Sequence, residues 1–452
     1  MLNLELKHGK MFLKKSKPFI FIFSLLFALS LSACSDNGTG VDPDPDNGTD
    51  GPAATIQGSV DESSQGKAKT AESSVEGTVV YAATVNSSGS VEMIEGTETE
   101  ADASGEFSVN VDASISDHFV IVAETSSGEA KGFISAEIEN DQSYTIKPLD
   151  EESTAQTSVF VEVVADGQAD VVQKSDIELA VRAESSAEIN ADASVAAEVA
   201  AAVSQSAEAR AEFVAEAESE ATLSQAHDVI ADLQFQLETN LDGASSDDEK
   251  RAAFDAFVEA KVNAYAEVGM EMSNVAKMLH LEAEIKQEAM SSVSAEVQNS
   301  SRATASYAAA IAIDSAVLAS AEASGFSNET ISAVADAGVS LRAELESSSG
   351  ASGEVEAAFE TYHQEVRAAF EGDASVEAAV IVAVDTEVQA NGGAKATFES
   401  ALNNILGLQS FADIYAEFSG NVESTVESQM ELIGDVDAEV VTEIVVLINL
   451  FS

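Results

Sequence analysis

Cysteine, tryptophan and basic residues are scarce in this chain of 452 residues, and each scarcity excludes something. The one cysteine, Cys34, has no partner for a disulfide within the chain, so no disulfide framework stabilises the fold. Tryptophan is absent and aromatic residues make up 6%, which leaves Ala, Val, Ile and Leu to build the cores. Hydrophobic residues still reach 45%, too many for a wholly disordered chain. We therefore expect a folded protein with few aromatic anchors.

Positive charge is also scarce, because 21 basic residues face 80 acidic ones and the formal net charge is -59. Such a surface repels phosphate backbones, so we expect no nucleic acid partner. This charge is typical of halophilic adaptation, since a Debye length of about 3 Å near 1 M salt screens the repulsion between carboxylates. A calcium-saturated surface is the alternative, although the carboxylates form no repeated ligand loops.

The first 33 residues have the order of a secretory signal peptide. Five lysines within residues 7–17 precede an apolar run at 19–31, which is too short for a membrane-spanning helix. Either Met1 or Met11 can serve as the start. The run ends in Leu31-Ser32-Ala33-Cys34, which resembles the lipobox of bacterial lipoproteins.

The lipobox resemblance implies cleavage before Cys34 and lipidation of its thiol with diacylglycerol, followed by fatty acids such as palmitate. A free thiol or an intermolecular disulfide at Cys34 is the alternative. Two or three acyl chains hold a protein on a membrane without a spanning helix. Ser35 resembles the residue that follows the cysteine in outer-membrane lipoproteins, and Ser35-Asp36 loosely resembles the surface-export signal of Bacteroidota lipoproteins. We therefore expect a lipid anchor in the outer membrane, on its periplasmic or cell-surface side.

Residues 34–52 contain almost nothing that could enter a core. Their Gly, Pro, Asn and Asp residues predict a flexible acidic tether between the anchor and the folded part. A calcium site is the alternative, because four aspartates recur at short intervals: Asp42, Asp44, Asp46 and Asp50.

Residues 53–150 alternate apolar and polar side chains in short runs separated by Gly and Ser. This period predicts a small antiparallel β-sandwich. The predicted strands are residues 55–60, 77–85, 105–111, 118–123, 132–136 and 144–146.

Three motifs in this region resemble the carboxypeptidase regulatory-like, transthyretin-type domain of bacterial surface proteins. They are Ile56-x-Gly58-x-Val60, Val79-x-Tyr81-Ala82 and the sequence Asp-Ala-Ser-Gly-Glu-Phe-Ser-Val at 102–109. In that family the Gly-x-Phe element, here Gly105 to Phe107, places an aromatic ring in the core after a tight turn. The resemblance implies a structural or binding module and no catalysis. The insertion at 61–75 leaves the pairing of the first two strands open.

From residue 151 to 452 the pattern predicts an α-helical bundle. Ser153 is the expected cap of the first helix, an Ala-rich helical stretch runs from about residue 191 to 237, and Ser246 starts another long helix. The apolar stripe of that helix predicts core packing: Phe254, Val258, Tyr265, Val268, Met272, Val275 and Leu279. Breaks are expected at 299–301, 325–327, 347–350, 372–373, 391–393, 420 and 434–435.

The last segment, residues 440–451, is the most apolar part of the mature chain. It is too short to span a membrane and has no basic flanks, so we expect a core helix that closes the bundle. Insertion into a membrane is the alternative.

The sequence shows no catalytic constellation. There is no nucleophile elbow, phosphate-binding loop or dinucleotide fingerprint, and Cys34 is consumed by the anchor. The histidines have no metal-ligand spacing and are expected on the surface or as helix caps: His8, His118, His227, His280 and His363. We therefore predict no catalytic, cofactor-binding or metal-binding residue.

These observations predict an α+β multidomain lipoprotein of the cell envelope. Its parts are a signal peptide at 1–33, a tether at 34–52, a β-sandwich at 53–150 and a helical domain at 151–452. The expected role is structural, adhesive or partner-binding, with the membrane and an unknown protein or glycan as partners. A hydrolase acting on polymers is the alternative, and a clustered pair of buried carboxylates in a cleft would favour it. A helical cage for apolar cargo would need a large apolar cavity.

Overall fold

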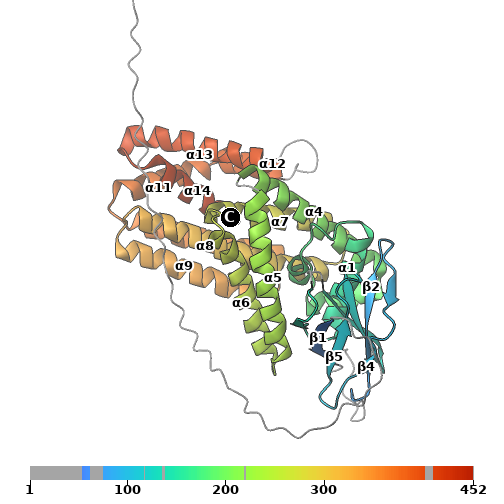
Figure 1. The fold of residues 1–452 in the computed structure, drawn as a ribbon. Helices are drawn as coiled ribbons and strands as arrows, with labels where there is room; N and C mark the ends of the chain where they lie inside the picture. The colour runs from blue at the N-terminus through green and yellow to red at the C-terminus, as the bar shows by residue number, and fades with distance from the viewer. Residues whose placement is uncertain are drawn as a thin grey trace, which may run out of the picture. The chain divides into compact units, whose positions relative to one another are not determined.

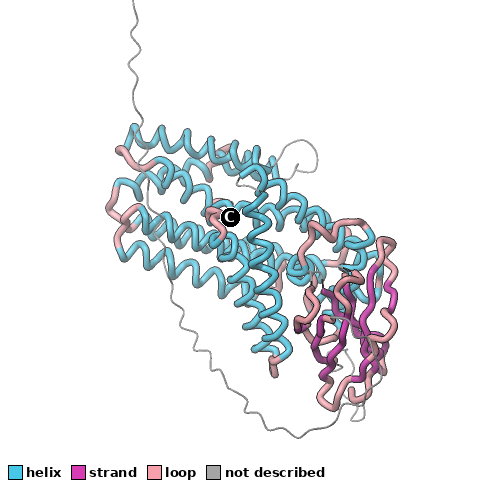
Figure 2. Tube along the Cα trace, in the orientation of Figure 1, coloured by secondary structure: helices cyan, strands magenta, loops and turns pink. Residues whose placement is uncertain are grey.

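A computed structural model of the chain describes residues 53–61, 75–116, 118–134, 138–217, 220–402 and 411–450 (Figure 1). The predicted signal peptide, the lipobox Leu31-Ser32-Ala33, Cys34 and the predicted tether lie outside the described residues, as does most of the insertion at 61–75. The described chain is a mixture of strands and helices, with all strands before the first helix (Figure 2).

The β region contains two small sheets. The three-stranded sheet has the order β5-β1-β8, and the five-stranded sheet has the order β3-β2-β6-β7 with β4 paired to β2. The strands are β1 Ala54–Ser59, β2 Val79–Val85, β3 Val91–Met93, β4 Thr99–Glu100, β5 Glu106–Val111, β6 Phe119–Thr125, β7 Gly128–Ile134 and β8 Ser143–Thr145.

Each of the six predicted runs coincides with a strand, although β7 begins four residues before the predicted run at 132–136. The short strands β3 and β4 were not predicted, because three and two residues are too few to show a period. The prediction of purely antiparallel pairing is wrong for one pair: β1 and β8 run parallel, with Ile56 opposite Tyr144. The chain passes through the whole other sheet between these strands, so no hairpin forces them to be antiparallel.

A hydrophobic cluster contains side chains from both sheets, among them Ile56 and Phe107 from the smaller sheet and Val80 and Ile121 from the larger. Gly58 lies where there is no room for a side chain, since a Cβ there would be 2.9 Å from both Ile146 Cγ1 and Phe107 Cζ. The glycine therefore allows the Phe107 ring to pack against β1.

Fourteen helices follow in the described residues. They are α1 Glu151–Ala165, α2 Lys174–Ala180, α3 Ala183–Ala191, α4 Ala193–Ala217, α5 Glu220–Asp242, α6 Asp247–Glu267, α7 Met272–Ala289, α8 Ala295–Ala323, α9 Asn328–Ser347, α10 Ser352–Glu371, α11 Val376–Val388, α12 Ala394–Leu402, α13 Phe411–Ile433 and α14 Ala438–Ile448.

Two predicted helix starts have different outcomes. Asp150, and not Ser153, is the N-cap of α1: its Oδ1 accepts from the Ser153 backbone N–H, and Ser153 Oγ accepts from the Asp150 N–H. The capping box thus places Ser153 three positions inside the helix. Ser246 does cap α6, since its side chain accepts from the Glu249 N–H.

The predicted apolar stripe belongs to two helices instead of one. Gly269, with φ +94, ends α6, and the N–H groups of Gly269 and Met270 close a Schellman motif on Ala266 and Tyr265. Glycine takes this left-handed conformation without a steric penalty. The apolar stripe alone does not show that a helix ends there.

Two predicted breaks are wrong. Helix α8 continues through 299–301, where Arg302 Nη1 donates to the Asn299 side-chain oxygen at 2.9 Å and Ser300 and Ser301 are buried against neighbours. Gly420 lies inside α13, between the buried residues Phe418 and Val422. A helical glycine costs about 1 kcal/mol relative to alanine, and packing on both sides outweighs that cost.

Helices α8 and α14 are both core helices. Among the described residues, α8 is the one helix long and apolar enough to cross a membrane, but 61% of its apolar window is buried inside the protein. Helix α14 buries Val441, Thr442 and residues 444–448 in the same hydrophobic core. The prediction of a core helix at the end of the chain is therefore confirmed.

Helix α1 packs against the five-stranded sheet, and α2, α3 and α4 contribute side chains to the same hydrophobic cluster. The rings of Phe133 on β7 and Phe160 on α1 stack at 4.4 Å, and Lys131 donates its backbone N–H to Thr154 Oγ1 at 3.0 Å. The described residues, from 53 onward, belong to one compact unit.

Candidate functional site

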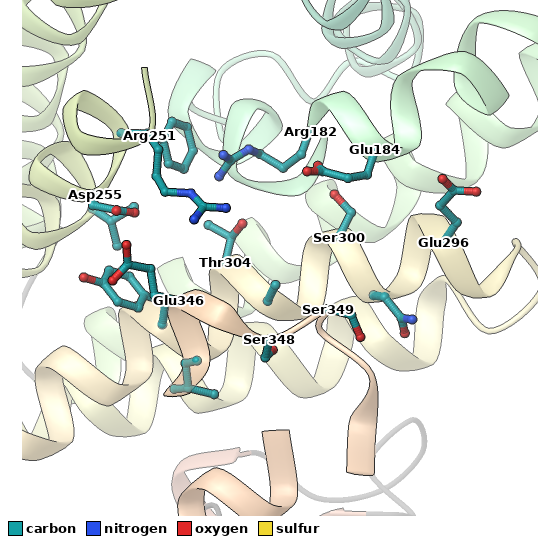
Figure 3. Close-up of a pocket in the computed structure, with 16 residues that line it drawn as sticks. Arg182, Glu184, Arg251, Asp255, Glu296, Ser300, Thr304, Glu346, Ser348 and Ser349 are labelled. Atoms are coloured by element: carbon teal, nitrogen blue, oxygen red, sulfur yellow. The ribbon is translucent and has the colours of Figure 1, made fainter. Parts of the chain in front are cut away.

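The candidate site is a cavity of about 480 Å³ in the helical region. The segment before α3, helices α3, α6 and α8, the end of α9 and its connection to α10 line it. Figure 3 shows charged and hydroxyl side chains from all of these segments around one space. A cavity of this volume is in the range that small ligands occupy.

Two arginines enter this cavity from different elements, and we call it the arginine cavity. Figure 3 shows the guanidinium groups of Arg182 and Arg251 pointing into it. The Cζ atom of Arg182 lies 3.8 Å from the centre of the Phe254 ring, so a cation–π contact holds this side chain in place. Neither arginine forms an ion pair within 4 Å with any carboxylate of the described chain. In a protein with a formal net charge of -59, this cavity brings together two of the few basic side chains.

Hydroxyl and amide groups form the wall of the arginine cavity on α8. Ser300 and Thr304 lie one turn apart, and Asn299 and Tyr307 flank them. Ser300 is 7% exposed, and its buried Oγ has no hydrogen-bond partner within the described residues. A buried hydroxyl without a partner is uncommon in native proteins and indicates room for one more group.

The arginine cavity also carries carboxylates, namely Glu184, Asp255, Glu296 and Glu346. Burial and the Glu346 carboxylate raise the pKa of Asp255, while Arg182 and Arg251 partly offset this. Positive and negative groups therefore line the same cavity, and each influences the other. Such an arrangement binds a ligand that carries both signs better than a simple anion.

A network of buried charges lies next to this cavity. Arg210 on α4 binds Asp176 through both terminal nitrogens, at 2.8 and 2.7 Å, and Glu282 at 2.8 Å. Lys261 on α6 lies 3.0 Å from Asp176, and Lys286 on α7 lies 4.0 Å from Glu282. The network ties α2, α4, α6 and α7 together and fixes the helix that carries Arg251.

A second buried cluster lies between α2, α5 and the end of β8. Lys174 pairs with both Glu178 and Glu238, and Gln234 Nε2 donates to the same two carboxylates. Burial, together with Glu238, raises the pKa of Glu178 to about 7. This is a clustered pair of buried carboxylates, and Glu238 also lines a cavity.

The expectation of surface or capping histidines is wrong for two residues. His280 is 2% exposed and bonds the Tyr415 hydroxyl, and burial lowers its pKa to about 3. His363 is 7% exposed and bonds Asp385 at 2.9 Å. Phe398 and Tyr415 from later helices contact His280, and Asp385 on α11 bonds His363, contacts that the local sequence does not show. His118 and His227 are half-buried, and His8 lies outside the described residues.

Sequence reasoning missed the arginine cavity completely. Cys34 and its lipobox, which it did predict, lie outside the described residues, as do the aspartates at 42, 44, 46 and 50. The one available signal was the scarcity of basic residues, which makes the position of each arginine informative. Within the described part of the chain, no group of three or more His, Cys, Asp or Glu side chains is arranged to hold a metal ion.

Comparison with known protein families, characterised proteins and solved structures finds no match to this chain.

Proposed function

We propose that this protein is a cell-envelope lipoprotein that binds an ampholytic partner, such as a short peptide or the end of one, in the arginine cavity. One observation carries the proposal: Arg182 and Arg251 enter the same cavity without a carboxylate partner in the described residues. The anchor at Cys34, the outer-membrane location and the regulatory-like β-sandwich formed by the two sheets are parts of the same proposal. They rest on the sequence.

The chemistry of the cavity selects the ligand class. A carboxylate of the ligand fits between two guanidinium groups, which bind carboxylates through paired N–H donors. An ammonium group fits beside Glu346 and Asp255, and the ligand's amides fit the hydroxyls of Ser300 and Thr304. A simple anion would meet four carboxylates with only two arginines to balance them.

Isothermal titration with the dipeptide alanyl-alanine, its C-terminal amide and its N-acetyl form tests this proposal. We expect the free dipeptide to bind best, since only it offers both groups. Arg251→Gln should weaken binding by about 10- to 100-fold, the effect of losing one hydrogen-bonded charge. Lys250→Gln is the matched control, because it removes one positive charge from the neighbouring position, outside the cavity lining. Equal binding of all three probes, or equal effects of the two variants, would contradict the proposal.

The anchor has a separate test. The membrane-bound protein should yield an N-terminal peptide beginning at lipidated Cys34 in mass spectrometry, and Cys34→Ser should release the protein from membranes. An unmodified peptide that spans Ala33 and Cys34 in the membrane-bound protein would overturn this part and leave the arginine cavity untouched.

Hydrolysis of a polymer is the second candidate function, and the Glu178 and Glu238 pair favours it. Burial raises the pKa of Glu178 to about 7, whereas the Lys174 ammonium outweighs burial at Glu238 and lowers the pKa of that carboxyl. Pairs with separated pKa values are typical of general acid and base chemistry. The test is release of new reducing ends from soluble polysaccharides, which Glu238→Gln should abolish. Release that Glu238→Gln leaves unchanged would argue against this pair.

A further inference from the structure

A second cavity lies where the β region meets the helical region. Its volume is about 610 Å³, and its walls come from the β8 segment, the connection from α1 to α2, the start of α2, and α5. We call it the junction cavity. It shares no lining residue with the arginine cavity, so the two are separate candidate sites.

Buried polar atoms without hydrogen-bond partners line the junction cavity. They are Gln234 Oε1, Gln173 Oε1 and His227 Nε2, and none has a partner among the described residues. Gln234 is only 5% exposed, and its amide nitrogen is already occupied by Glu178 and Glu238. Its oxygen is therefore fixed in orientation and offers an unused acceptor. Buried acceptors of this kind are costly unless a donor reaches them.

An aromatic surface faces the same cavity. The rings of Tyr144 on β8 and Phe235 on α5 lie 5.1 Å apart at an angle of 45°. Both residues line the cavity and are only half-buried. The face of an aromatic ring carries negative charge and attracts the positively polarised C–H groups of a flat ligand.

The charges around the junction cavity disfavour an anionic ligand. Lys174 lines its inner wall but is paired with Glu238, which lines the same wall. Burial, with the nearby Arg210, lowers the pKa of His227 to about 4, so the imidazole offers no positive charge near neutral pH. Asp170, Asp228 and Asp232 are exposed at the rim and repel an anion. A neutral ligand rich in hydroxyl donors avoids this repulsion and reaches the unpaired acceptors.

We propose that the junction cavity binds a neutral saccharide, whose hydroxyls donate to the unpaired acceptors and the rim aspartates and whose ring stacks on Phe235. The carboxylates on the rim suit pairs of neighbouring hydroxyls, because each offers two acceptor oxygens. Glycan binding here also gives the β region a direct role, since Tyr144 comes from its last strand.

The test uses the whole mature protein on an array of neutral mono- to tetrasaccharides, followed by titration of the best glycan. Phe235→Ala should weaken binding by about tenfold or more, which corresponds to the loss of one stacked aromatic contact. Gln236→Ala is the matched control: it is the next residue on α5, is exposed, and does not line the cavity. Thermal melts of both variants show whether they fold.

A second readout locates the ligand independently of any variant. The imidazole nitrogen resonances of His227 should shift on addition of the glycan, because its Nε2 gains a donor, while those of His280 and His363 stay unchanged. Release of shorter saccharides would support the site and identify it as catalytic. No retained neutral glycan, or binding that survives Phe235→Ala and leaves His227 unchanged, would overturn the proposal and show that the cavity holds water only.

Discussion

Replacing Arg210 by methionine tests whether the buried charge network holds the helices together. Arg210 is one of the largest fully buried side chains, at 1% exposure, and its three short hydrogen bonds reach Asp176 and Glu282. Methionine keeps an unbranched apolar chain but is shorter and carries no charge. Asp176 and Glu282 then stay buried with only the lysines to balance them.

The expected loss follows from those lysines. Removal of one partner of a buried ion pair costs about 3–5 kcal/mol, because the other charge stays in a medium of low dielectric constant. Lys261, at 3.0 Å from Asp176, keeps part of the balance after Arg210→Met, so the loss should be near the lower end, about 3 kcal/mol. After Asp176→Leu, Glu282 is the one carboxylate of the network that remains to balance Arg210, Lys261 and Lys286. That loss should be near the upper end, about 5 kcal/mol.

Urea unfolding at constant high NaCl, followed by the circular dichroism of the helices, measures both losses, since the chain has no tryptophan to report by fluorescence. Lys131→Met is the control, because Lys131 is only half-buried and pairs at 2.9 Å with the exposed Glu129, so its loss should cost less than about 1 kcal/mol. If Arg210→Met cost no more than the control, or if Asp176→Leu cost less than Arg210→Met, the argument from uncompensated buried charge would be refuted.

Three further predictions concern stability. Thermal melts should shift upward with rising NaCl, because salt screens the repulsion among 80 acidic residues; a melting temperature indifferent to salt contradicts the halophilic interpretation. Burial raises the pKa of Glu178 from 4.5 to about 7, so between these pH values the folded state binds more protons than the unfolded state. The free energy of unfolding should therefore fall as the pH rises through this window, by up to about 3 kcal/mol. Glu178→Gln should flatten that part of the pH profile, and an unchanged slope in urea titrations would show another group to be responsible. Gly350→Ala should cost more than about 2 kcal/mol, because φ is +78 and a Cβ would overlap the Asn299 carbonyl oxygen, whereas Gly353→Ala, with no atom nearby, should be neutral or stabilising.

The strands were predictable because their signal is local. The alternation in Glu106–Val111 is complete, with Phe107, Val109 and Val111 buried and the residues between them exposed. The parallel pairing of β1 with β8 was not predictable, since pairing depends on contacts between segments nearly ninety residues apart. The alternation of apolar and polar side chains within one segment identifies a strand, but it does not show which other strand pairs with it.

The predicted helix boundaries were wrong where packing competes with the local preference of the residues. Ser300 and Ser301 locally favour a break, yet they are buried on α8 against other helices. Gly269 lies within the apolar stripe, yet its backbone ends α6. The cavities were not predicted for the same reason. Arg182 and Arg251 lie far apart in the sequence, and only the packing of the helices brings them to one cavity.

Positive and negative charge have different places in this protein. The basic residues lie mainly inside it or around cavities: Lys147, Lys174, Arg210, Lys261 and Lys286 are buried or nearly so, Arg182 and Arg251 line the arginine cavity, and Arg302, Arg367 and Lys395 line a third cavity of about 890 Å³. Acidic residues occupy most exposed helix faces. Attraction to the many surface carboxylates would by itself favour the few cations on the surface. Holding them inside costs desolvation, which fixed carboxylate partners offset in the buried network. Arg182 is half-buried and Arg251 is exposed, so water hydrates both guanidinium groups, and neither is held in an ion pair within the described chain that a ligand in the arginine cavity would have to break.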